Sequence, residues 1–354
     1  MINKKMLISS LLFVIGGFIF FGAIHASAES MEPKVSIKPV IPENQQNKEA
    51  KYFDSRMKPN QKEQVVIQLT NQTKEQVHLK VAFADAKTTS QGVIDYSDNQ
   101  HLRSKAPQEL LFTQMISGPS DIVLKAQETK EVVFELLMPE DVFDGFVLGG
   151  IEFIEEISEQ KESSTLMTQM SYLVGFKLSE TDNELPYDLV LEEPRVGMKD
   201  YKNAILVSLA NQNGRLINEL KLSIQVIKKE EETVILQSHL ESARIAPYSI
   251  MEIPVYIEDD LLDPGNYEIH IQAKSDEGFQ KEWVEMFEVT KKDHELFKEN
   301  DTLWIEDTTT NNKLIFFITV ITLVILTVML IIIYKYVLNK KRKKGVKQWK
   351  KRKK

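Results

Sequence analysis

The side chains that could carry catalysis are scattered along this chain rather than gathered into a recognisable motif. Five histidines lie beyond residue 28, and no two of them have the spacing of a zinc site. They are His78, His101, His239, His270 and His294. Nucleophile elbows, phosphate-binding glycine loops and calcium loops are missing, and the chain has no cysteine. We therefore expect no enzyme, no cofactor, no metal site and no disulfide.

Acidic residues are abundant and often adjacent, as in Glu155-Glu156, Glu192-Glu193 and Asp259-Asp260. A glycosidase needs two carboxylates that face one cleft, one of them with a raised pKa. Adjacent residues on a β-strand point to opposite faces, so these pairs are poorly placed for that chemistry. A glycoside hydrolase is therefore the least favoured interpretation.

A pair of glycines, Gly149 and Gly150, is the strongest local anomaly within a strand-like segment, residues 146–154. Glycine weakens a strand unless the chain bulges or another surface comes close. One interpretation is a bulge or tight packing between sheets. The other is a flat place where a glycan or a partner strand approaches the backbone.

Alternation of apolar and polar residues dominates the chain between its two ends, and this pattern predicts β-strands. Turn residues separate the strands at regular intervals, with no helical crossovers, which is typical of an all-β sandwich. The first series of predicted strands covers residues 64–69, 77–84, 92–96, 110–116, 121–124, 131–137, 146–154 and 167–178. The second series covers residues 187–191, 204–209, 220–227, 233–237, 250–257, 267–273 and 283–289.

The two series of strands resemble one design used twice. Residues 64–73 and 203–212 are both alternating strands that end in Asn-Gln, and residues 126–145 align with 246–265 without a gap. We therefore predict two tandem immunoglobulin-like β-sandwiches, over residues 29–180 and 187–291. A polar, acidic stalk follows over residues 292–313.

Charge is distributed unevenly along the chain. Twelve lysines and arginines without acids fill residues 335–354, and residues 1–28 add two lysines. Subtracting these fourteen positive charges from the total of −8 leaves −22 for residues 29–313. An acidic surface keeps the protein soluble, favours cationic partners and disfavours nucleic acid.

The two ends of the chain predict its topology. Residues 1–28 have the basic start, apolar body and Ala26-Ser27-Ala28 cleavage site of a signal peptide. Residues 314–334 carry no charge and are long enough to cross a bilayer as a helix. The basic tail, residues 335–354, should stay in the cytoplasm. Proteins that are cut before a similar helix and attached to the peptidoglycan of Gram-positive bacteria carry a Leu-Pro-x-Thr-Gly motif there. That motif is absent here, so we expect the helix to stay attached. It would be a single-pass anchor in the cell membrane, with the sandwiches outside.

Several motifs in the first predicted sandwich occur in the order found in a known family. They include the segment from Val35 to Gln46, Tyr52-Phe53-Asp54, Pro59-Asn60-Gln61, Thr88-Thr89, the segment from Gly92 to Tyr96, and the segment from Phe143 to Ile151. This order resembles the peptidoglycan-binding domain of WxL-interacting proteins, cell-surface proteins of Gram-positive bacteria. The second predicted sandwich resembles the host-binding domain of that family. Asn60 stands where the family usually has glycine, and asparagine also tolerates positive φ.

The resemblance implies a binding role toward peptidoglycan, a WxL-domain surface protein and a host-matrix protein. Tyr52 and Phe53 would stack on sugar faces, and nearby polar side chains would bond hydroxyl and amide groups. In the alternative interpretation Phe53 lies in the core and the polar residues form turns. The candidate binding residues are Asn44, Gln45, Gln46, Tyr52, Phe53, Asp54, Gly149 and Gly150.

Two interpretations of function follow, besides the disfavoured one of a cell-wall hydrolase. In the first, the protein is a scaffold at the cell wall that binds peptidoglycan and holds a WxL-domain protein. In the second, it is an adhesin whose second sandwich binds host matrix, and its wall contact is incidental.

Overall fold

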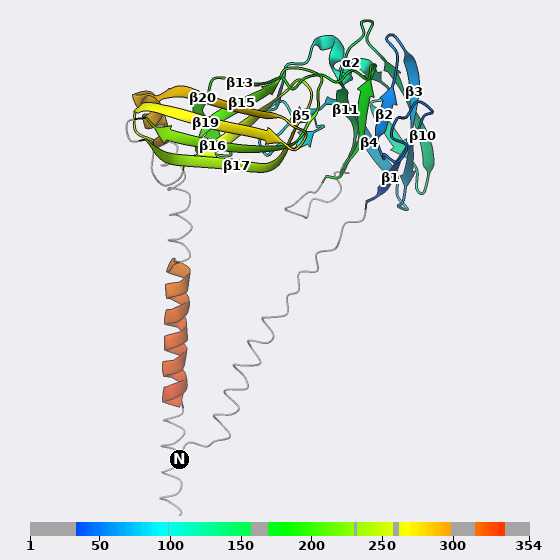
Figure 1. Cartoon of the computed structure of the whole chain (residues 1–354). Coiled ribbons are helices and arrows are strands. Elements are labelled where there is room, and N and C mark those ends of the chain that lie inside the picture. The colour runs from blue at the N-terminus through cyan, green and yellow to red at the C-terminus, as the bar shows by residue number, and fades with distance from the viewer. Residues whose placement is uncertain are drawn as a thin grey trace, which may run out of the picture.

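The computed structural model describes residues 33–97, 99–156, 169–229, 232–257, 262–298 and 316–336. Two β-sandwiches lie side by side, and a separate helix follows them in the chain (Figure 1). The predicted all-β class with two immunoglobulin-like sandwiches is therefore confirmed. The predicted signal peptide, most of the predicted cytoplasmic tail and most of the predicted stalk lie outside the described residues.

One sheet of the first sandwich, sheet A, has the strand order β1-β3-β10-β8. In β3 the side chains of Val65, Ile67 and Leu69 are buried and alternate with more exposed residues, as the sequence predicts. The strands are β1 Val35–Val40, β3 Lys62–Asn71, β8 Ile116–Ser117 and β10 Thr129–Leu137.

The opposing sheet, sheet B, has the order β2-β12-β11-β4-β9, in which β2 pairs in parallel with β12. Its strands are β2 Phe53–Arg56, β4 Val77–Asp85, β9 Asp121–Leu124, β11 Val147–Glu155 and β12 Ser171–Ser179. The turn before β3 contains Asn60 at φ 59°, so asparagine does adopt the positive φ expected there.

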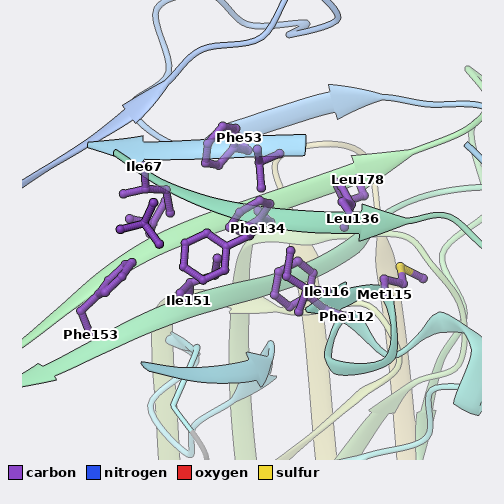
Figure 2. Close-up of a cluster of buried hydrophobic side chains, with 14 of the residues drawn as sticks. Phe53, Ile67, Phe112, Met115, Ile116, Phe134, Leu136, Ile151, Phe153 and Leu178 are labelled. Carbon is purple, nitrogen blue, oxygen red and sulfur yellow. The ribbon is translucent and has the colours of Figure 1, made fainter. Parts of the chain in front are cut away.

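Aromatic rings fill the core between sheets A and B (Figure 2). Phe53 and Phe176 stack with ring centroids 4.6 Å apart, and Phe112 lies 4.9 Å from Phe176. Phe134 meets Phe153 edge-on. Offset and edge-on contacts of this kind add to the stabilisation from burial itself.

One predicted strand of the first sandwich is wrong. Residues 110–116 form a short 3₁₀ helix, η1 (Gln108–Leu110), and a single helical turn, α2 (Phe112–Met115), before β8 begins. Phe112 and Met115 are both buried because a spacing of three residues places them on one side of a helical turn. The apolar residues in this segment therefore follow helical spacing, whereas a strand was the prediction from sequence.

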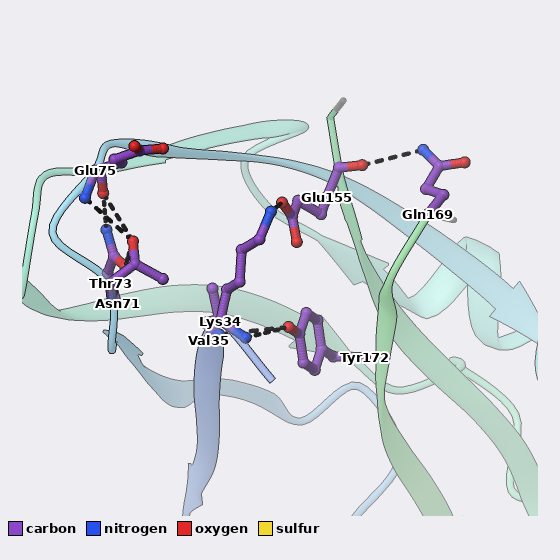
Figure 3. Close-up of polar contacts among 8 residues, drawn as sticks. All are labelled: Lys34, Val35, Asn71, Thr73, Glu75, Glu155, Gln169 and Tyr172. Atoms are coloured by element: carbon purple, nitrogen blue, oxygen red, sulfur yellow. Dashed lines mark hydrogen bonds and ion pairs between the residues drawn. The ribbon is translucent and has the colours of Figure 1, made fainter. Parts of the chain in front are cut away.

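The first strand is held in place by polar contacts at its start (Figure 3). The Tyr172 hydroxyl accepts the main-chain N–H groups of Lys34 and Val35 at 3.1 and 3.3 Å. The Lys34 ammonium also pairs with the Glu155 carboxylate. These contacts tie the start of β1 to the ends of β11 and β12 on the opposing sheet.

The second sandwich has sheet D, with the order β13-β15-β18-β7, and sheet E, with the order β17-β16-β19-β20. Strand β14 pairs with another part of β15. Sheet D contains β7 Arg103–Ser104, β13 Leu189–Leu191, β14 Arg195–Lys199, β15 Lys202–Asn211 and β18 Ser249–Tyr256. Sheet E contains β16 Ile217–Lys228, β17 Thr233–Ile245, β19 Gly265–Ser275 and β20 Gln280–Val289.

A segment of the first sandwich reaches into the second one, which the sequence did not predict. After the hairpin β5 (Lys87–Thr88) and β6 (Ile94–Asp95), the chain adds β7 to the edge of β18. Strand β7 thereby completes a sheet whose other strands lie more than 80 residues later. The two sandwiches consequently share a sheet.

The two sandwiches use the same device at the end of equivalent strands. Asn71, at the end of β3, donates its side-chain amide to the carbonyls of Glu75 and Lys125 (Figure 3 shows the Glu75 contact). Asn211, at the end of β15, donates in the same way to Arg215 and Ala246. This shared contact supports the predicted repetition of one design.

The second sandwich continues beyond its last strand. Residues 291–298 form a helix whose Phe297 side chain is buried in the second core. The Asn203 side chain also donates to the Phe297 carbonyl at 3.0 Å. The stalk was expected from residue 292, but the described chain stays packed on the sandwich to residue 297. A further helix, Phe316–Tyr336, is long and apolar enough to cross a membrane.

Candidate functional site

The connection between β1 and β2 carries most of the sequence-predicted binding residues, and Gln45 holds it together. The Gln45 side chain is buried, and its amide nitrogen donates to the carbonyls of Asn47 and Tyr52 at 3.0 and 2.9 Å. Its amide oxygen accepts the Asp54 N–H at 2.9 Å. With all of these groups engaged, Gln45 shapes the loop rather than facing a ligand.

Asn44 and Gln46 flank Gln45 and point toward Arg56. The Asn44 amide donates to the Glu63 carboxylate at 2.6 Å, and this bond opposes the effect of burial, which raises the pKa of Glu63. With its amide oxygen turned toward the guanidinium, Gln46 accepts from Arg56 at 2.8 and 3.2 Å. Arg56 also pairs with Asp182 and donates to Ser179, so the loop is fastened to the linker between the sandwiches.

Arg56 lies between two surface hollows. The larger is an open groove of ≈ 790 Å³ beside the turn at residues 57–61. The second, of ≈ 390 Å³, lies at the junction of the sandwiches, where Phe146 and Lys177 face Leu185 and Arg215. Both hollows are lined by amides and charged groups, a surface suited to a polar ligand.

Phe53 and Asp54 are both buried, but on opposite sides of β2. Phe53 stacks on Phe176 in the core, so its ring is not available to a sugar. The sugar-stacking role expected for Phe53 is therefore wrong, and the alternative interpretation, a core residue, is correct. Asp54 faces away from the core toward Lys177, whose ammonium lies 3.6 Å from its carboxylate. The Lys177 ammonium also lies 4.3 Å from the centre of the Phe146 ring.

The two glycines of β11 have different roles because they face opposite sides of sheet B. A Cβ atom on Gly149 would overlap the ring of Phe112, so this glycine makes room for α2 in the core. Both glycines keep regular pairing with β12 and β4, so no bulge is present. Tight packing therefore explains Gly149.

Gly150 lies on the outer face of sheet B, directly opposite Gly175 of β12. The side chains of Tyr96 and Leu173 lie over Gly150, and Tyr52 lies over Gly175. Tyr52 is 39% exposed and Leu173 is 49% exposed. We call these five residues the tyrosine shelf: Tyr52, Tyr96, Gly150, Leu173 and Gly175.

The phenol group of Tyr96 lies in a partly dry setting. Burial raises the pKa of the Tyr96 phenol, the charge of Arg244 opposes this rise, and Tyr52 adds to it. Tyr52 therefore lies near Tyr96 as well as above Gly175. Aromatic rings with polar hydroxyl tips, beside the exposed apolar side chain of Leu173, are suited to the apolar face and hydroxyl rim of a sugar ring.

The structure thus brings Tyr52 and Gly150 together, and it gathers Asn44 and Gln46 around Arg56. Three residues of the shelf were missed by the sequence analysis: Tyr96, Leu173 and Gly175. Gly175 does carry a usable signal, since a glycine inside an alternating strand marks a close approach. Within the described residues, no group of three histidines or acids is placed to hold a metal ion.

Several motifs that carried the family resemblance lie at the junction between the sandwiches. The Gly92 carbonyl accepts the Arg244 N–H at 2.8 Å, and the Gly214 carbonyl accepts the Phe146 N–H at 2.8 Å. The Thr88 hydroxyl accepts from the Ala246 N–H at 3.0 Å, while the Thr88 N–H donates to Ser249. These motif residues therefore join the two sandwiches.

Comparison with solved structures finds chains of similar fold at low identity. They include the chaperone–tip adhesin complex of CFA/I fimbriae, with 10% identity, 70% of this chain and 98% of that chain covered, and a TM-score of 0.30. The YadV chaperone matches with 10% identity, 72% and 100% coverage, and a TM-score of 0.27. A PapD-like domain of human CEP192 matches with 10% identity, 46% and 97% coverage, and a TM-score of 0.26. No conclusion about function rests on them. A comparison with curated proteins finds no match.

Two sequence profiles match most of the chain in the predicted order. Residues 35–155 match the peptidoglycan-binding domain of WxL-interacting proteins, and residues 161–298 match the host-binding domain of the same proteins. The second match begins before β12, although β12 belongs to the first sandwich. Both descriptions name binding rather than catalysis. The chain therefore belongs to the WxL-interacting protein family.

Proposed function

We propose that this protein is a membrane-anchored scaffold at the cell surface that grips peptidoglycan with its first sandwich and holds a WxL-domain protein there. The tyrosine shelf carries the peptidoglycan part of the proposal. It places the exposed Tyr52 ring and the exposed Leu173 side chain over two opposed glycines, in the sandwich that contains the match to a peptidoglycan-binding domain. The sugar rings of the glycan strand would stack on the Tyr52 ring.

The polar hollows around Arg56 extend the proposed contact. Asn44, Gln46 and Arg56 line these hollows, and on binding their amide and guanidinium groups would exchange their present partners for the acetamido groups and peptide carboxylates of peptidoglycan. The Asn44 and Gln46 side chains thus keep the binding role proposed from the sequence. Gln45 fixes the shape of their loop through its hydrogen bonds, and Phe53 anchors β2 in the core.

Peptidoglycan binding is tested by pelleting the detergent-solubilised full-length protein with purified peptidoglycan. Tyr52→Ala should reduce the bound fraction severalfold, and Tyr52→Phe should retain most of it because the ring remains. Tyr201→Ala removes a 72% exposed tyrosine from the second sandwich and is the matched control. Equal pelleting of the Tyr52→Ala and Tyr201→Ala proteins would contradict the shelf as the binding site.

The anchor part of the proposal rests on the helix Phe316–Tyr336, whose 21 residues span about 32 Å. A basic sequence follows it, which favours a cytoplasmic C-terminus. Protease treatment of intact cells should remove the sandwiches and spare an epitope placed after Lys354. Loss of that epitope would contradict the proposed orientation.

The adhesin interpretation is kept as the second candidate, because residues 161–298 match a host-binding domain. A single variant can separate binding to host matrix from binding to peptidoglycan. Tyr52→Ala should leave binding to immobilised matrix proteins unchanged while it reduces peptidoglycan pelleting. Capture of a purified WxL-domain protein by the full-length chain tests the scaffold role independently of both.

A further inference from the structure

Edge strands expose unpaired main-chain groups, and natural proteins usually protect them with short length, proline or bulges. Eight of the nine edge strands in sheets A, B, D and E fit this rule. Strands β2, β7, β8, β9, β13 and β14 have at most five residues each. Strand β1 contains Pro39, and β17 is broken by register shifts at three points.

Strand β20 is the exception among the described edge strands. It has ten residues, no proline and unbroken register with β19 from Gly265 opposite Val289 to Lys274 opposite Gln280. In the described parts of the chain, no other strand pairs with its outer side. A regular edge of this length is a template for an added strand.

The side chains of β20 show which strand would fit. Trp283 and Phe287 pack on the second core, so the alternate residues face outward. In that outward row Val284 is 58% exposed and Met286 is 44% exposed, and exposed Glu282 and Glu288 flank this pair. From Glu282 to Glu288 the row therefore reads acidic, apolar, apolar, acidic.

A second copy of this chain is a poor occupant for that row. Antiparallel pairing of two β20 strands about Glu285 would set Val284 opposite Met286, but it would also set Glu282 opposite Glu288 twice. Like charges directly opposite each other on paired strands are destabilising. The acidic ends of the row thus oppose self-pairing and favour a basic partner.

We propose that β20 is a docking edge for an extended segment of a partner protein, in which two basic residues flank two apolar ones at alternate positions. The added strand would extend sheet E through main-chain hydrogen bonds. Its basic side chains would lie opposite Glu282 and Glu288, and its apolar side chains opposite Val284 and Met286. This inference does not depend on peptidoglycan binding, which is proposed for the other sandwich.

A designed peptide tests this proposal with the full-length protein in detergent. The probe is fluorescein-labelled Lys-Thr-Val-Thr-Val-Thr-Lys, and its counterpart carries glutamate in place of both lysines. Fluorescence anisotropy should show about tenfold tighter binding of the lysine peptide, because two opposed charge pairs change sign. Peptide binding should also slow amide hydrogen exchange within Gln280–Val289.

A charge reversal separates the docking edge from non-specific attraction to an acidic protein. The double variant Glu282→Lys, Glu288→Lys should reverse the preference, so that the glutamate peptide binds more tightly. The control Glu193→Lys, Glu241→Lys makes the same change in net charge on other exposed residues and should keep the original preference. Thermal unfolding checks that both double variants are folded.

Three results would overturn the docking edge: no binding of either peptide at about 1 mM, equal preference in the two double variants, or exchange protection confined to residues outside β20. Tyr52→Ala, which tests the peptidoglycan proposal, should bind the lysine peptide as the unaltered protein does. The failure of one proposal therefore leaves the other testable.

Discussion

Adjacent residues in this protein differ in burial because successive side chains of a strand point to opposite faces of the sheet. Tyr52 is exposed on the tyrosine shelf, whereas Phe53 is buried against Phe176. Gly149 and Gly150 differ in the same way, one facing Phe112 and the other facing the shelf. The predicted binding motif therefore contains both surface-facing and core-facing residues.

Gly149→Ala should destabilise the protein, because the new methyl group would overlap the Phe112 ring. Overpacking of this kind costs about 1–3 kcal/mol in the free energy of unfolding. Gly265→Ala is the matched control, since nothing lies within 4 Å of its Cβ position, and it should change stability by less than about 0.5 kcal/mol. Chemical denaturation of both variants measures the difference. Equal stability of the two would show that α2 can shift away from β11.

Sequence alone could have separated Tyr52 from Phe53 only with knowledge of which face of β2 meets the core. Local alternation did predict β3 and β4 and their buried faces, since period two is a property of each strand by itself. The tyrosine shelf could not be predicted, because Tyr96 and Leu173 meet through pairing between distant segments. Helical spacing within the four residues of α2 was too short to distinguish from a strand.

At the scale of elements, the segment from β5 to β7 binds the sandwiches through charged groups as well as main-chain bonds. Arg103 donates to Glu192 at 3.0 Å and to Ser208 at 2.8 Å, and Lys105 lies 2.8 Å from Glu192. Glu252 in turn lies near Arg103, Arg195 and Lys199. Opposite charges thus surround both carboxylates at the junction.

The junction should weaken in acid because of Glu192. Burial acts to raise the pKa of this carboxyl, but the hydrogen bond from Lys105 and the charges of Arg103 and Lys105 outweigh it and lower the pKa. A lowered pKa in the folded state contributes stability above the unfolded value of 4.5, and this stability is lost as the pH falls further. Glu192→Gln should therefore flatten the dependence of the melting temperature on pH below about 4.5. An unchanged slope would remove Glu192 from the acid response.

At the scale of the whole molecule, the sandwiches are joined by contacts that sequence periodicity does not encode. Strand β7 joins sheet D, and the chain approaches itself closely at Gly145 and Gly214. A fragment that begins at residue 187 therefore lacks one strand of its own sheet, and one that ends at 290 also lacks Phe297. Host-binding assays should use the complete pair of sandwiches.

Gly145→Ala should loosen the contact between the sandwiches at Gly214 without unfolding either of them. Gly145 has φ +84°, and a Cβ atom there would lie 2.5 Å from the Gly214 carbonyl oxygen. Small-angle X-ray scattering should show a larger maximum dimension. Gly278→Ala carries a similar positive-φ strain at φ +94° but has no neighbour within 4 Å, so its scattering should match that of the unaltered protein. Identical scattering of both variants would show that the junction tolerates the added atom.

The shared sheet has a mechanical consequence. In the proposed role, any pull between the wall and the membrane enters at the tyrosine shelf and leaves through the helix Phe316–Tyr336, so it must cross the junction. The links at Thr88, Gly92 and β7 all join the two sandwiches and would divide that tension among them rather than fail one after another. The two sandwiches would then transmit force across the junction as one unit.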